Sequence, residues 1–237
     1  MLKGPAKRFY EHAQANVCAD GHGVSLDGRT VNTPLGESLI VPSAELAQEI
    51  AAEWQGQGDR IVPDTMPMMR LACTAIDKSS PNRADIIEQM CDYGANDLLC
   101  YRAEGPDDLV TRQDAVWQPL LEWAKTSYEV DLKTTSGIVH VSQSETEIAK
   151  LRHAVDDHDD FEMTALTEIT QLTGSLVLGL AFSSNHIGWE DAFDASQLDE
   201  TWQNERWGED YEAADRKKNR RSDMETTARY LMLVRAN

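Results

Sequence analysis

The spacing of apolar residues changes once along the chain, near Pro42, and this change predicts two kinds of structure. Before Pro42, apolar and polar residues alternate around Asp27-Gly28, a dipeptide that favours a two-residue hairpin turn. After Pro42, apolar residues recur every three or four positions, as in amphipathic helices, and Ser43 is suited to cap the first of them. The pattern predicts an α+β fold, with a small N-terminal antiparallel β domain followed by a larger all-helical C-terminal domain.

We expect the β-rich domain to cover residues 1–60 and the helical domain to cover residues 61–237. Residues 131–141 include several β-branched side chains and predict a short β excursion within the helical domain. Pro119 lies inside an otherwise helical stretch, and a proline there removes a backbone hydrogen bond. It therefore predicts a kink or a break in that helix.

Charge is the strongest signal in the composition, because 22 Lys and Arg face 41 Asp and Glu, which gives a formal net charge of −19. Such a field repels phosphate backbones and anionic lipid surfaces, so it argues against nucleic-acid binding and favours a basic partner. The most apolar run, residues 176–182, is too short to span a bilayer. We therefore expect no membrane insertion.

The four cysteines form no CxxC pair, and three of them lie in apolar surroundings, so we expect reduced core residues in a reducing compartment. His153 and Asp157 share a helical face, but their spacing is not that of HExxH, and aspartates at a helix start commonly serve as caps. Gly174 and Gly179 lack the lysine of a phosphate-binding loop and instead suggest close helix packing. No GxSxG elbow is present. The sequence therefore indicates no catalytic residue, no metal site and no cofactor.

Residues 198–210 place two of the six tryptophans among carboxylates, and ten carboxylates lie between Glu190 and Asp215. One interpretation is a docking surface, because tryptophan is enriched in interface hot spots. The other is a charged helix whose Trp202 belongs to the core beneath Arg206, with the acids facing solvent. The basic residues of 216–221 follow at once and could neutralise part of this charge within the chain. Composition alone leaves both interpretations open.

Several ordered blocks of the chain resemble the assembly-chaperone family that attends the alpha subunit of the F-type ATP synthase head. The matching blocks are KRFY (7–10), LDGRTVNTP (26–34), AAEW (51–54), MPMMRLACTAID (66–77), DLLCYRAEGPDDLVTRQ (97–113), WQPLLEWA (117–124), DDF (159–161), TGSLVLGLA (173–181) and WQNERWGED (202–210). The resemblance implies the same two-part fold and a function without catalysis. Such chaperones bind the newly made alpha subunit before it meets the beta subunit, in mitochondria and in alphaproteobacteria.

The N-terminus shows no arginine-rich, acid-poor presequence, so we expect the bacterial cytoplasm here, and the mitochondrial matrix for eukaryotic relatives. An unassembled alpha subunit would expose an apolar and partly basic interface, which an acidic helical surface with tryptophan anchors could cover. The candidate partner-binding residues are Glu200, Trp202, Glu205, Trp207, Glu209 and Asp210. Two alternatives remain: an acidic binding module for another basic protein, and an enzyme with a carboxylate or histidine site between the domains.

Overall fold

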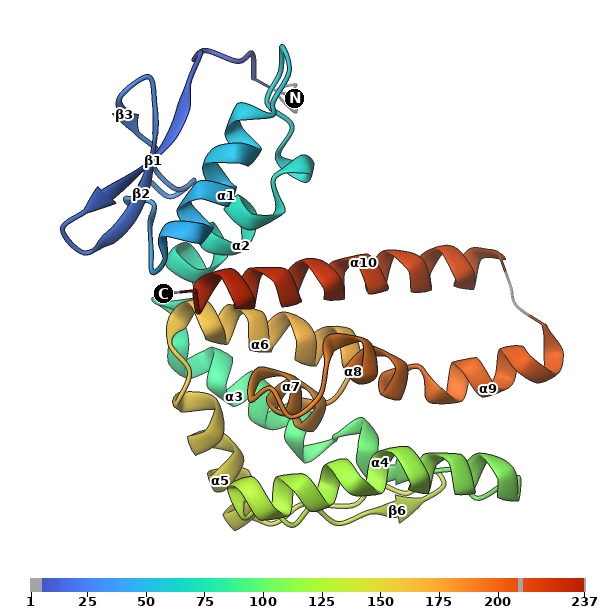
Figure 1. The fold of residues 1–237 in the computed structure, drawn as a ribbon. Coiled ribbons are helices and arrows are strands. Elements are labelled where there is room, and N and C mark those ends of the chain that lie inside the picture. The colour runs from blue at the N-terminus through green and yellow to red at the C-terminus, as the bar shows by residue number, and fades with distance from the viewer. Residues whose placement is uncertain (1–5, 209–210, 237) are drawn as a thin grey trace. The chain divides into compact units, whose positions relative to one another are not determined.

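The computed structural model describes residues 6–208 and 211–236, and its contacts divide the chain into two compact units (Figure 1). Unit 1 consists of Met1–Arg83, Asp160–Ala165 and Ala228–Asn237. Unit 2 consists of Ala84–Asp159 and Leu166–Thr227. The boundary near residue 60 stays a prediction, whereas the order of an N-terminal antiparallel sheet followed by helices confirms the α+β class.

The sheet of unit 1 is antiparallel throughout, and its central strand β2 pairs with the three others. Its strands are β1 (Ala13–Cys18), β2 (Gly21–Leu26), β3 (Arg29–Thr30) and β4 (Ile40–Val41). Leu26 lies opposite Arg29, and the two residues between them, Asp27 and Gly28, have φ angles of 48° and 80°. Positive φ at both positions is the geometry of a two-residue hairpin turn, so the predicted hairpin is confirmed.

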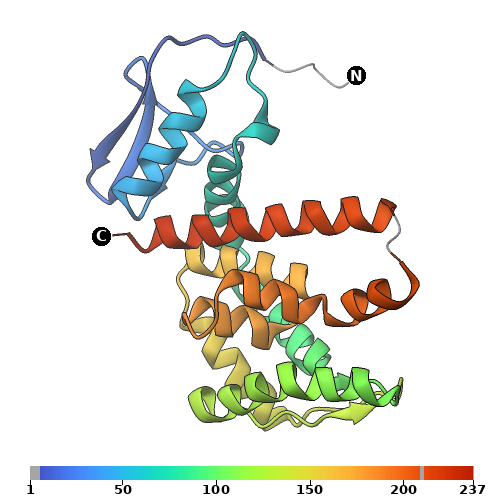
Figure 2. The same cartoon turned by 45° about the vertical axis from the view of Figure 1, so that its right-hand side comes forward.

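Helix α1 (Ala44–Gln55) packs on this sheet, as Figure 2 shows. The Ser43 hydroxyl accepts a hydrogen bond from the Leu46 amide at 3.1 Å, which confirms the predicted cap. Helix α1 also supports the next helix, α2 (Pro67–Thr74), because the Glu53 carboxylate accepts the amides of Met68 and Met69 at 2.7 and 2.8 Å. A short 3₁₀ turn η1 (Pro63–Thr65) precedes α2, and a π turn η2 (Ala75–Ser79) follows it.

Unit 1 is completed by segments that are distant in sequence. The Ser43 hydroxyl donates to the Leu233 carbonyl at 2.5 Å, and Arg229 pairs with Glu49 at 2.7 Å. The hydroxyls of Ser79 and Thr164 lie 2.7 Å apart. The first and last parts of the chain therefore fold together in this unit.

Unit 2 is built mainly from helices. Those with residues in it are α3 (Arg83–Ala95), α4 (Asp107–Tyr128), α5 (Glu145–Asp156), α6 (Asp160–Thr173), α7 (Leu176–Ser183), α8 (Trp189–Ser196), α9 (Leu198–Trp207) and α10 (Tyr211–Val234). After the 3₁₀ turn η3 (Leu98–Cys100), β5 (Tyr101–Arg102) pairs in parallel with β6 (Thr135–Ser136). This two-residue strand is the β structure within residues 131–141.

Helix α4 continues through Pro119, so of the predicted kink or break, the break does not occur. Packing on both sides of the proline explains why the helix persists. Trp117 is 1% exposed, and its indole N–H donates to the Ala195 carbonyl at 2.9 Å. Leu120, Leu121 and Ala124 are buried on the other side of Pro119. This burial compensates for the backbone hydrogen bond that the proline removes.

The four cysteines are free, and Cys73, Cys91 and Cys100 are buried, whereas Cys18 is partly exposed. Burial raises the pKa of the Cys100 thiol to about 12, so this thiol stays protonated and unreactive at neutral pH. Within residues 6–208 and 211–236, every helix is too short or too polar to cross a membrane.

Gly179 in α7 confirms the predicted close packing of helices through glycine. A Cβ at this position would lie 2.6 Å from Thr170 Oγ1 and 3.0 Å from Leu166 Cδ1, both in α6. Gly179→Ala is therefore expected to lower the free energy of unfolding by about 1–3 kcal/mol, as overpacking of a core does. Urea unfolding would measure this change. The control is Gly58→Ala, because a Cβ there meets open space; equal stability of both variants would contradict the packing role.

Candidate protein-binding site

The two tryptophans of α9 lie in different environments. Trp202 is 6% exposed and Trp207 is 73% exposed. Leu198, one turn before Trp202, is also buried, and α9 packs against α4 and α8. Trp202 therefore belongs to the core of unit 2, and Trp207 presents its ring to solvent.

Asp108 in the first turn of α4 fixes the ring of Trp202. Its Oδ2 accepts the indole N–H of Trp202 at 2.9 Å and also pairs with the Arg206 guanidinium. The bonds from Trp202 and Arg206 hold the pKa of Asp108 below its ordinary value. Arg206 stacks 4.3 Å from the centre of the Trp202 ring, and the Trp207 ring lies edge-on to it at 5.6 Å. The predicted stacking of Arg206 on Trp202 is confirmed, and Trp202 supports the exposed Trp207.

Glu205 forms a two-bond ion pair with Arg112 of α4. Nη1 and Nη2 of Arg112 lie 2.8 and 2.9 Å from the two carboxylate oxygens. The Glu205 side chain is 53% exposed and that of Arg112 is 41% exposed. These bonds lower the pKa of Glu205 and raise that of Arg112. Glu205 is therefore accessible, ionised at neutral pH and already bound to a cation.

Gln113, 1% exposed, is a second buried link between α4 and α9. Its Nε2 donates to Asp199 Oδ1 at 2.8 Å, and its Oε1 accepts the Ala103 amide at 2.8 Å. The contribution of α4 to this site was not predicted from the sequence. One sequence feature could have pointed to α4: Asp108 and Arg112 are four residues apart, so their charged side chains lie on one helical face.

The remaining candidate residues differ in what the structure describes. Glu200 is partly exposed, and among residues 6–208 and 211–236 no ion pair involves it. Glu209 and Asp210 lie outside the described residues. The structure therefore brings Glu200, Trp202, Glu205 and Trp207 together on one helix.

Among the residues that the structure describes, the basic residues of 216–221 form no ion pair with the carboxylates of α9. Arg221 pairs with Asp194 at 3.2 Å, and Arg216 lies 3.8 Å from Glu212. Lys217 donates to the Thr201 hydroxyl, which carries no charge. Basic and acidic residues nearly balance in unit 1, so almost all of the net charge of −19 falls in unit 2. The acidity is thus a property of the unit that presents Trp207.

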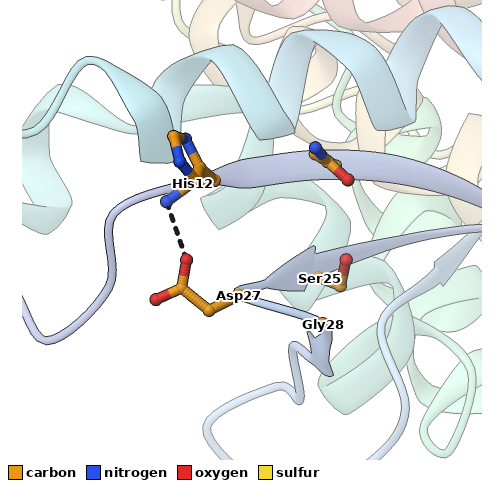
Figure 3. Close-up of a pocket in the computed structure, with 5 residues that line it drawn as sticks. His12, Ser25, Asp27 and Gly28 are labelled. Carbon is orange, nitrogen blue, oxygen red and sulfur yellow. Dashed lines mark hydrogen bonds between the residues drawn. The ribbon is translucent and has the colours of Figure 1, made fainter.

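Unit 1 contains a hollow of about 230 Å³, which is a competing candidate site (Figure 3). It is lined by His12, Gln14, Ser25, Asp27 and Gly28. The Asp27 carboxylate accepts the backbone amides of His12 at 2.9 Å and Glu11 at 3.0 Å, and these bonds lower its pKa. The carboxylate therefore ties the turn at Asp27 to the backbone that leads into β1, and its bond to His12 is to the backbone amide. This arrangement activates no nucleophile.

The histidine-aspartate cluster at the end of α5 shows no ligand geometry. His158 Nδ1 lies 3.0 Å from the Ala154 carbonyl and Nε2 lies 2.6 Å from the Ser183 hydroxyl, so both ring nitrogens have partners. In the part of the chain that the structure describes, no three His, Cys, Asp or Glu residues could together hold a metal ion.

A family model, a curated protein and solved structures that are similar to this chain point to the same family. The family model described as ATP12 chaperone protein matches residues 7–125. The crystal structure of Atp12 from Paracoccus denitrificans shares 38% identity, with a TM-score of 0.93 over 97% of this chain and 99% of that one. Protein Atu1473 from Agrobacterium tumefaciens shares 33% identity, with a TM-score of 0.90 over 97% of this chain and 86% of that one. Mitochondrial protein atp12 of Schizosaccharomyces pombe is 24% identical over 220 residues, which cover 85% of this chain and 74% of that protein.

Proposed function

This chain belongs to the ATP12 chaperone family, and from this premise we propose that it binds the unassembled alpha subunit of the F-type ATP synthase and promotes assembly of the catalytic head. The observation that carries the proposal is an exposed Trp207 on the same helix as the carboxylates of Glu200 and Glu205, in the acidic unit of the chain. A partner that fits this surface is basic and partly apolar. We place this action in the bacterial cytoplasm, which agrees with the identity to the two bacterial proteins.

The two kinds of side chain have different tasks in this proposal. Carboxylates steer the encounter with a basic surface and raise the association rate, while a large aromatic anchor that becomes buried slows dissociation. Trp202 holds the anchor in place and does not itself contact the client, because it is buried. Glu209 and Asp210 extend the same acidic sequence and are proposed to contribute complementary charge.

Charge reversal at one residue tests the acidic part of this surface. Glu200→Lys is expected to weaken binding of the alpha subunit about 5- to 10-fold, because it opposes a basic client at the contact itself. Dissociation constants from titration calorimetry at moderate salt would measure the change.

The matched control is Glu122→Lys, which alters the net charge equally on an exposed position of unit 2. Glu122 lies ten residues after Arg112, about 15 Å further along α4. Its variant is expected to lose less than about 2-fold in affinity. If both variants lose the same affinity, the effect is one of net charge and the assigned surface is wrong.

A further inference from the structure

The pair between Arg112 and Glu205 shows which cation the Glu205 carboxylate accepts. Two parallel N–H···O bonds of 2.8 and 2.9 Å join the guanidinium to both oxygens. Only a planar guanidinium offers two donors in this arrangement, whereas a lysine ammonium acts as a single point charge. Glu205 is therefore oriented for an arginine.

The pair is also open to exchange. Both side chains are about half exposed, so solvent screens the pair and reaches both partners, and another cation can take the place of either partner's ligand. Glu205 is one turn from Trp202, and the ring of Trp202 lies 5.6 Å from the ring of the exposed Trp207. A client that contacts Trp207 therefore brings its own charged groups close to this pair.

Opening the pair leaves α9 in place. Trp202 stays buried and bonded to Asp108, and Gln113 stays bonded to Asp199. Trp117 of α4 remains bonded to the Ala195 carbonyl in α8, the helix that precedes α9. Since these contacts hold α9 against its neighbours, Arg112 is not needed to position Glu205.

From this geometry we infer that Arg112 occupies the position that an arginine of the client takes on Glu205. The inference rests on the proposed binding of the alpha subunit and adds the chemistry of one contact to it. In the unbound chaperone, Arg112 is bound to the Glu205 carboxylate, so a client arginine has to displace it. Binding replaces one guanidinium with another, and Arg112 is released to solvent.

The test removes the internal competitor. Arg112→Gln is expected to tighten binding of the alpha subunit about 3- to 10-fold, because the Glu205 carboxylate then lacks its bonded guanidinium and is free to accept another. Arg112→Lys keeps the charge but cannot form both bonds, so an intermediate affinity is expected. Glu205→Gln is expected to weaken binding, and in the double variant Arg112→Gln, Glu205→Gln the gain from Arg112→Gln should disappear. Melting temperatures of all variants should stay within about 2 °C of the parent, since the pair is exposed.

A second ion pair of unit 2 provides a matched control. Arg152 pairs with Glu88 through both of its terminal nitrogens and is likewise 41% exposed, but it joins α5 to α3. Arg152→Gln changes the net charge by the same amount and is expected to alter affinity less than about 2-fold.

Equal tightening by Arg112→Gln and Arg152→Gln would show a net-charge effect and overturn the inference. Weaker binding by Arg112→Gln would overturn it as well, because Arg112 would then support the site. If the parent chain fails to bind the alpha subunit at all, the proposed function falls, and this inference with it.

Discussion

Asp97→Ala is expected to lower the free energy of unfolding by about 4 kcal/mol. The Asp97 side chain is fully buried, and its carboxylate accepts the Ser175 hydroxyl at 2.7 Å and the amides of Leu99 and Val177 at 3.0 Å each. It joins η3 to the start of α7, whose residues are almost all buried. Alanine would leave three buried donors without an acceptor, and each such donor is costly.

Chemical denaturation at neutral pH would measure this loss. The control is Ser175→Ala, which removes one donor to Asp97 and the hydroxyl that accepts the Leu178 amide, and it is expected to cost about 1–2 kcal/mol. An Asp97→Ala protein as stable as the parent would show that the carboxylate does not hold these elements together.

The stability difference between the parent and Asp97→Ala is expected to depend on pH. Burial raises the pKa of Asp97 from 3.8 to about 6, although its hydrogen bonds oppose the shift. Because the folded-state pKa lies above the unfolded value, the folded protein binds this proton more tightly. The contribution of the group is fully present below about pH 4 and is lost as the pH rises through 6. The stability difference between the parent and Asp97→Ala should therefore be about 1 kcal/mol larger at pH 5 than at pH 7.

Trp207→Ala is expected to weaken binding of the alpha subunit about 30-fold or more, while the fold stays intact. The ring is 73% exposed in the unbound chain, so its removal costs little folding energy, whereas a tryptophan anchor at an interface commonly contributes 2 kcal/mol or more. Dissociation constants and melting temperatures, measured on the same samples, would separate the two effects.

Trp202→Ala serves as the contrasting variant. Its ring is 6% exposed and bonded to Asp108, so truncation is expected to lower stability by about 3 kcal/mol or more. Loss of binding in that variant would follow from loss of structure. Unchanged affinity in Trp207→Ala, with the parent binding normally, would remove this residue from the interface.

Local patterns in the sequence predicted most of the secondary structure. The Asp27-Gly28 hairpin, the Ser43 cap and the helix Leu198–Trp207 are all present in the structure. Each depends on residues close together in the chain, where turn chemistry, capping and periodicity decide the outcome. The helix does not break at Pro119, because burial on both sides of the proline outweighs one lost backbone hydrogen bond, and this burial depends on α8, far away in sequence.

The proposed binding surface was only half visible in the sequence, because its tertiary contacts join residues that are far apart in the chain. The acids and tryptophans of α9 could be singled out, but their partners Asp108, Arg112 and Gln113 lie about ninety residues earlier. Only the fold shows that Trp202 is a support and Trp207 is exposed, because both have the same chemistry and lie on one helix. The exchangeable pair of Arg112 and Glu205 likewise depends on a tertiary contact.

Selective capture of one ATP synthase subunit would identify the client of this chaperone. The purified, tagged chain would be offered separately expressed alpha and beta subunits from the same source at moderate salt, with both shown to be soluble and unassembled. We expect the alpha subunit to be retained and the beta subunit to pass through. Retention of neither subunit, or retention of both equally, would contradict the proposed function.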